Sequence, residues 1–161
     1  MADGDDLTHL DDHGHARMVD VSDKDRTVRE AVAAGAVVMR PDTLARILAG
    51  EVEKGDVLAV ARVAGISAAK KTPDLVPLCH PVALTSVSVD FAPDSSSGTL
   101  RVTATARAAD RTGVEMEALV AVAGACLCIY DMCKAVDRAM VLSDIRLLSK
   151  RGGRSGEWVR E

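Results

Sequence analysis

The sequence predicts an α+β fold, in which helices cover one face of an antiparallel sheet. Residues 82–91 and 99–107 alternate apolar with polar side chains across the turn-forming run APDSSSG, which predicts a β-hairpin. Residues 118–130 are apolar or glycine on every face, which predicts a long helix buried on all sides. With 161 residues, the chain is long enough for a single domain with a real hydrophobic core.

Caps and turn residues place the remaining elements. Thr27 is a suitable N-cap, Gly35 and Gly50 are suitable helix ends, and Pro41 suits a first helical position. In chain order these signals predict a strand over 16–22, a helix over 28–34, a strand over 36–40, helices over 41–51 and 55–71, a stiff proline loop over 72–81 and a last strand over 140–148.

Composition divides the chain into an acidic segment (1–15), a single α+β catalytic domain (16–148) and a basic, glycine-rich tail (149–161). Residues 1–25 hold eight aspartates and two basic residues, so the rest of the chain is slightly basic. This balance does not suggest nucleic-acid binding, and an aromatic content of 2% argues against base stacking. It leaves room for a local basic pocket that holds phosphates.

The cysteines and the N-terminal sequence predict a soluble, cytoplasmic protein with no membrane segment. The four cysteines have no metal-ligand spacing, and three of them lie in the apolar helix. No basic, apolar leader and no run of membrane-spanning length is present. The run HLDDHGH (9–15) is a nominal metal site, but in an acidic, loose segment we expect it to be solvated.

Charged residues at the C-terminal end of the apolar helix are the first candidates for chemistry. Asp131 and Lys134 are three residues apart, so they share a helix face and can pair. A structural ion pair is one interpretation. In a dry neighbourhood, however, desolvation raises the pKa of an aspartate and lowers that of a lysine, which would suit both for acid–base catalysis near neutral pH.

Glu115 and Glu117 lie at the other end of this helix, where they can support its N-terminal dipole or bind a ligand. Fourteen residues separate Glu117 from Asp131, which corresponds to about 21 Å along a helix axis. A small ligand cannot easily touch both in one chain. We therefore expect two copies of the helix to bring opposite ends together.

His80 is fixed between Cys79 and Pro81 in the proline loop and is either a site residue or a structural one. A Cys79–His80 nucleophilic pair is disfavoured, because adjacent side chains in an extended loop point apart. The basic residues Lys54, Arg62, Lys70, Lys71, Lys150, Arg151 and Arg154 form either a solvated face or a site for an anionic ligand such as a nucleoside triphosphate. The chain has no GxxxxGK[ST] loop, which excludes a P-loop NTPase.

Nearly the whole chain, from Leu7 to Gly156, resembles the molybdenum cofactor biosynthesis protein C (MoaC) family. The stretches that carry the resemblance are LTHLDDHGHARMVDVSDKDRTVREAVAAG, KGDVLAVARVAGISAAKKTPDLVPLCHP, DRTGVEMEALVAV, YDMCKAV and RLLSKRGGRSG. It implies a ferredoxin-like fold and a homohexamer, a trimer of dimers with its pocket between subunits. The implied activity is that of a lyase, which converts (8S)-3′,8-cyclo-7,8-dihydroguanosine 5′-triphosphate from a preceding radical enzyme to cyclic pyranopterin monophosphate and diphosphate.

The resemblance also implies roles for single residues. Asp131, Lys134 and Lys54 would be catalytic. The substrate would be bound by Leu78, Cys79, His80, Met116, Glu117, Glu115, Arg29, Lys70 and Lys150, with Arg29, Lys70 and Lys150 directed to the phosphates. No cofactor is required, although Mg²⁺ can accompany the triphosphate. The alternative is a non-catalytic, oligomeric pterin- or nucleotide-binding partner, which would have no use for Asp131 beside Lys134.

Overall fold

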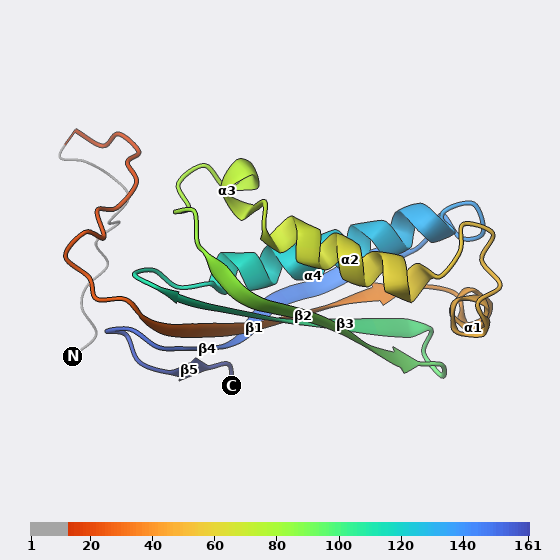
Figure 1. Ribbon diagram of the computed structural model, residues 1–161. Coiled ribbons are helices and arrows are strands. Elements are labelled where there is room, and N and C mark those ends of the chain that lie inside the picture. The colour runs from red at the N-terminus through yellow and green to blue at the C-terminus, as the bar shows by residue number, and fades with distance from the viewer. Residues whose placement is uncertain (1–12) are drawn as a thin grey trace.

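A five-stranded antiparallel sheet carries its helices on one face (Figure 1). The computed structural model describes residues 13–161. The elements are β1 (Thr27–Val38), α1 (Pro41–Ala49), α2 (Val57–Ala69), α3 (Thr72–Leu75), β2 (Leu84–Asp94), β3 (Thr99–Asp110), α4 (Glu115–Cys133), β4 (Val141–Arg151) and β5 (Trp158–Val159). The strand order is β2-β3-β1-β4-β5. The α+β prediction is confirmed, and the arrangement agrees with a ferredoxin-like fold.

The predicted hairpin and the predicted long helix form the two layers of the core. β2 and β3 pair in antiparallel register, with Val89 opposite Ala104 and Phe91 opposite Val102. Val89, Val102 and Ala104 are buried in the same cluster as Ala121 of α4. The predicted helices over 41–51 and 55–71 are also confirmed, as α1 and α2.

The prediction of a helix over 28–34 is wrong, because these residues belong to strand β1 in the middle of the sheet. β1 pairs with β3 along its whole length and with β4 on its other side. Ala31, Ala33 and Val37 are buried beneath the helices. The alanines favour a helix locally, but hydrogen bonding on both sides and burial at every second position override that propensity.

Three smaller predictions also need correction. Residues 16–22 form no strand beyond an isolated bridge at Ala16. The proline loop contains the short helix α3. The last strand continues to Arg151, and β5 pairs with it through Lys150 and Trp158, so part of the basic, glycine-rich tail joins the sheet. Residues 9–12 of the nominal metal site lie outside the described part of the chain.

Glycine and alanine let α2 and α4 approach closely over the sheet. A Cβ atom at Gly65 would lie 2.8 Å from the Ala121 carbonyl oxygen, and one at Gly124 would lie 2.5 Å from Ala68 Cβ. α2 runs antiparallel to α4, because Lys54 just before α2 contacts Asp131 near the end of α4. The N-terminal end of α2 therefore lies beside the C-terminal end of α4, and the C-terminal end of α2 points toward the N-terminal end of α4.

By length and composition alone, α4 could cross a membrane, with a mean hydropathy of 1.7 over its most apolar window. Half of that window is buried inside the fold. The core helix of a soluble domain passes the same test, so this feature is weak evidence for a membrane.

Candidate functional site at the two ends of helix α4

Lys54, Asp131 and Lys134 form a charged cluster at the C-terminal end of α4. Lys54 Nζ lies 3.1 Å from Asp131 Oδ2 and 2.8 Å from the Asp131 carbonyl oxygen, and Lys134 Nζ lies 2.7 Å from Asp131 Oδ1. Lys54 comes from the loop between α1 and α2, where Gly55 has a φ of 102°. The structure thus brings together the three residues that the resemblance marks as catalytic.

The environment of Asp131 differs from the one predicted. Its side chain is 59% exposed, because α4 ends at the surface. Hydrogen bonds from Lys134 and Lys54, in that order, hold the pKa of the Asp131 carboxyl below its ordinary value. The expectation that desolvation raises this pKa is therefore wrong. At neutral pH Asp131 is therefore an ionised carboxylate between two lysine side chains, and only this ionised form can accept a proton.

Residues from two distant stretches meet at the N-terminal end of α4. Burial raises the pKa of the Cys79 thiol, and the charge of Glu117 in the first turn of α4 adds to this effect. Glu117 is 3% exposed, and this burial raises the pKa of its carboxyl. His80 Nε2 lies 2.7 Å from the Val19 carbonyl oxygen. Nε2 therefore carries the hydrogen and donates a hydrogen bond to this carbonyl group, which lies in the segment before β1.

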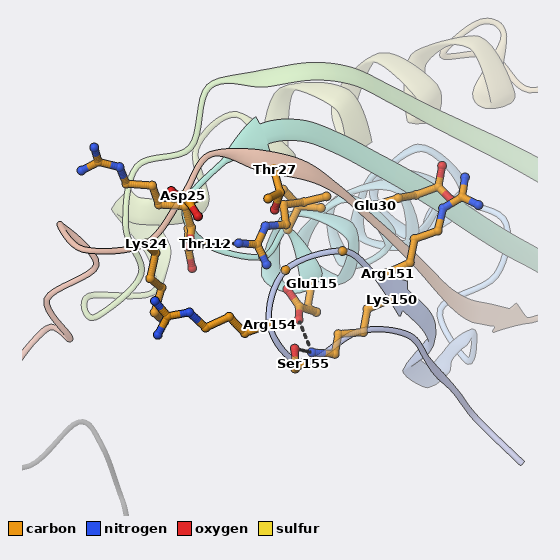
Figure 2. A pocket seen from close by; sticks show the side chains of 16 residues that line it. Lys24, Asp25, Thr27, Glu30, Thr112, Glu115, Lys150, Arg151, Arg154 and Ser155 are labelled. Carbon is orange, nitrogen blue, oxygen red and sulfur yellow. Dashed lines mark hydrogen bonds and ion pairs between the residues drawn. The ribbon is translucent and has the colours of Figure 1, made fainter.

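A pocket of about 440 Å³ opens at the same end of α4 (Figure 2). Its walls come from the start of β1, the loop before α4, the end of β4 and the glycine-rich loop after it. Three acidic residues line it against the six basic residues Lys24, Arg29, Arg111, Lys150, Arg151 and Arg154. Lys150 Nζ lies 2.5 Å from Ser155 Oγ and 3.7 Å from Glu115 Oε1, so this lysine is oriented by both α4 and the loop. The excess of positive charge suits an anionic ligand.

Arg29 is a buried residue of the pocket lining. Its guanidinium donates to the carbonyl oxygens of Asp110 at 3.2 Å and Arg111 at 3.3 Å. A side chain at Gly153 would overlap this guanidinium, so glycine is needed there for the loop to close over it. Within residues 13–161, the ion pairs that form include none to Arg29, which leaves its charge available to an anion.

Of the residues predicted to bind the substrate, Arg29, Glu115 and Lys150 line this pocket, whereas Leu78, Cys79, His80, Met116, Glu117 and Lys70 do not. Sequence reasoning did not select Lys24, Thr27 or Arg111, which do line it. Thr27 Oγ1 is buried without a hydrogen-bond partner in the described chain. Arg111 precedes a helix N-terminus, the usual place for anion-binding groups, and this signal could have identified it. Lys70 is exposed at the C-terminal end of α2 and does not line the pocket.

The two groups of site residues lie at opposite ends of one helix (Figure 1). Glu117 and Asp131 both belong to α4, and their fourteen-residue separation corresponds to about 21 Å of rise. The two groups therefore do not form a single compact pocket within one chain.

Comparison with known proteins decides the family. The model of the MoaC family matches residues 18–153. This chain belongs to the MoaC family. A cyclic pyranopterin monophosphate synthase of Chloroflexus aurantiacus is 64% identical to this MoaC-family chain over 154 residues, covering 96% of the chain and 94% of the relative.

Two further relatives carry the same name. The protein from Roseiflexus sp. (strain RS-1) is 61% identical over 156 residues, covering 97% of this chain and 99% of its own. The protein from Geobacter sulfurreducens is 58% identical over 155 residues, covering 96% and 97%. The likeness extends over both ends of α4, so it includes both groups of site residues in this MoaC-family chain.

Proposed function

We propose that this chain is a cyclic pyranopterin monophosphate synthase, an enzyme of molybdenum cofactor biosynthesis. Its substrate would be (8S)-3′,8-cyclo-7,8-dihydroguanosine 5′-triphosphate, and its products cyclic pyranopterin monophosphate and diphosphate. The observation that carries this proposal is the likeness to proteins of that name over nearly the full length of both chains. A cytoplasmic location and supply of the substrate by a preceding radical enzyme belong to the same proposal.

The Lys54–Asp131–Lys134 cluster supports a role in proton transfer. Rebuilding a purine as a pyranopterin needs several proton transfers but no net oxidation or reduction. Asp131 is ionised and can take a proton, and each neighbouring ammonium group can give one. A module that only held its ligand would gain nothing from a carboxylate placed between two lysines.

The pocket at the other end of α4 supports a role in binding the triphosphate. Lys150 and Arg29 provide two cations, and the backbone of the Gly152–Gly153 loop can approach a phosphate closely. Within residues 13–161, no three histidine, cysteine, aspartate or glutamate side chains gather as a candidate metal site. We therefore assign no step to a metal ion held by the protein.

The 21 Å separation along α4 favours an active site completed by a second subunit. Val63 of α2 is 67% exposed and Leu127 of α4 is 62% exposed, so the helix layer presents apolar side chains outward. Such side chains suit a contact between copies of the chain. A homohexamer, built as a trimer of dimers with the pocket between subunits, would meet both requirements.

The direct test is diphosphate release from the cyclic dihydro-GTP substrate by the purified protein and by Asp131→Asn. We expect the wild-type chain to release diphosphate. The variant should bind the substrate with similar affinity but lose most turnover, about 10²-fold or more, since it lacks the proton acceptor. Tight binding without release by either protein would favour the non-catalytic binding partner, and unchanged turnover in the variant would overturn the role of Asp131.

A further inference from the structure

Asp137 joins the turn after α4 to the first turn of α1. It lies three residues beyond Lys134 and is 4% exposed. Its Oδ2 accepts hydrogen bonds from the Arg40 N–H at 2.9 Å and the Thr43 hydroxyl at 3.3 Å, and its Oδ1 accepts one from the Ala139 N–H at 3.1 Å. The mechanism proposed above does not use this buried carboxylate.

Other hydrogen bonds close the same turn around Asp137. The Arg40 guanidinium donates to the Val136 carbonyl oxygen at 3.0 Å, and the Tyr130 hydroxyl donates to the Arg138 carbonyl oxygen at 3.2 Å. The Arg40 N–H holds the pKa of the Asp137 carboxyl below its ordinary value. At neutral pH the group is therefore a carboxylate and accepts from all three donors.

Helix α1 connects this turn to the loop that carries Lys54. α1 begins directly after Arg40 and ends at Ala49, and Lys54 follows in the next loop. Leu44 and Ile47 fix its inner face in the core. Figure 1 shows α1 at the end of the sheet where α4 also ends. A short helix anchored at its start and along one side is a rigid spacer between the end of α4 and the Lys54 loop.

We infer that Asp137 is a positioning residue of the proposed active site, which holds α1 and its following loop so that Lys54 stays within hydrogen-bond reach of Asp131. Lys54 contacts Asp131 across 77 residues of sequence, and its own side chain is 46% exposed. Its position therefore depends on the backbone that carries it. The catalytic meaning of this inference rests on the proposed function, because a misplaced proton donor slows only a reaction that uses it.

The protonation of Asp131 provides a readout that loss of stability alone would not move. The charged and titratable groups that face Asp131 are Lys54 from the loop and Lys134 and Cys128 from α4. If Lys54 withdraws, one of the two cations that lower the pKa of Asp131 is lost. This pKa then rises toward its ordinary value, and the acid limb of the pH–rate profile moves to higher pH.

The test compares Asp137→Asn with Asp94→Asn in the full-length protein. Asparagine has one acceptor oxygen where aspartate has two, so one donor at position 137 would face an NH₂ group. Asp94 is a matched control, because its Oδ1 accepts the N–H groups of Ser96 and Ser97 within its own turn. The measurements are melting temperature, kcat and KM over pH, and the Asp131 pKa from ¹³C carboxyl shifts, which requires no turnover.

We expect Asp137→Asn to lower kcat about tenfold with little change in KM, and to raise the pKa of Asp131. Asp94→Asn should lose stability only. Thr43→Val removes one donor to Asp137, so it should give a smaller change in the same direction and carries the test if Asp137→Asn does not fold.

A folded Asp137→Asn with wild-type kcat and Asp131 pKa would overturn the inference. If the wild-type protein released no diphosphate, the proposed function would fail, while the NMR titration would still decide whether Asp137 positions Lys54.

Discussion

At the scale of single residues, the surroundings shift the pKa values of two carboxyl groups of α4 in opposite directions. Asp131 is exposed between two ammonium groups, which lower its pKa. Glu117 is buried beside Cys79, and burial raises its pKa. A single helix therefore carries a carboxyl group with a lowered pKa at one end and a carboxyl group with a raised pKa at the other, which suits a reaction with several proton transfers.

The burial of Glu117 predicts a pH-dependent cost in stability. Its pKa is about 4.3 in an unfolded chain and higher in the folded one. The stabilisation from the neutral carboxyl is complete below the unfolded value and is lost as the pH rises through the folded value. Glu117→Gln removes this titration. The melting temperature of the variant relative to wild type should therefore be more favourable at pH 7.5 than at pH 4.5, in thermal unfolding without substrate. An equal difference at both pH values would contradict the burial cost.

Which residues bear charge at the ends of α4 could be predicted from the sequence, but their surroundings could not. The spacing of Asp131 and Lys134 identified the pair. Exposure depends on where the helix ends relative to the surface, and the contact of Asp131 with Lys54 joins segments that no local pattern relates. The pocket residues Thr27 and Arg111 were missed for the same reason, since β1 and β3 bring them together through pairing at their ends.

At the scale of elements, the close approach of α2 to α4 sets the distance between their charged ends. The contact is made by glycine and alanine, and the carbonyl oxygen of Ala121 faces Gly65 directly. A backbone atom cannot yield as a flexible side chain can. The packing of these two helices is therefore specified by the absence of side-chain atoms at a few positions.

Gly65→Ala tests this packing, because two effects oppose each other. Alanine is the better helix former by about 1 kcal/mol, but its Cβ would lie 2.8 Å from the Ala121 carbonyl oxygen. We expect the steric effect to dominate and the free energy of unfolding to fall by about 1–3 kcal/mol in urea titrations. Ser67→Ala, at an exposed position of the same helix, is the control and should be neutral or slightly stabilising. A more stable Gly65→Ala would show that the helices have room to separate.

Strand β1 shows why one element was predicted wrongly while its neighbours were predicted correctly. β2 and β3 have clear alternation of apolar and polar residues, so local pattern and sheet agree. The inward positions of β1 are Ala31, Ala33 and Gly35, because α4 packs so closely that a Cβ at Gly35 would lie 2.7 Å from Val122 Cγ1. The small residues that this contact requires include alanines, which favour a helix when only the sequence is considered. The reason for them lies in α4, almost ninety residues further along the chain.

At the scale of the whole molecule, one chain presents two separate groups of site residues. The Lys54–Asp131–Lys134 cluster and the basic pocket around Lys150 lie at opposite ends of α4. In a dimer with twofold symmetry, each of two equivalent sites would combine the cluster of one subunit with the pocket of its partner. Neither subunit would then need to span the substrate alone, and activity would depend on assembly.

Mixed oligomers test this arrangement directly. Lys134→Ala and Lys150→Ala impair different ends of α4, so each should be inactive alone. In a shared-site dimer of the two variants, one site has both defects and the other has none. Random mixing makes half of the dimers mixed, so co-expressed variants should recover about a quarter of wild-type diphosphate release.

Lys54→Ala mixed with Lys134→Ala is the control, because both changes fall in one cluster and every site keeps a defect. Recovery in the first mixture alone would establish a site built from two chains, whereas no recovery in either would place the whole reaction within one subunit.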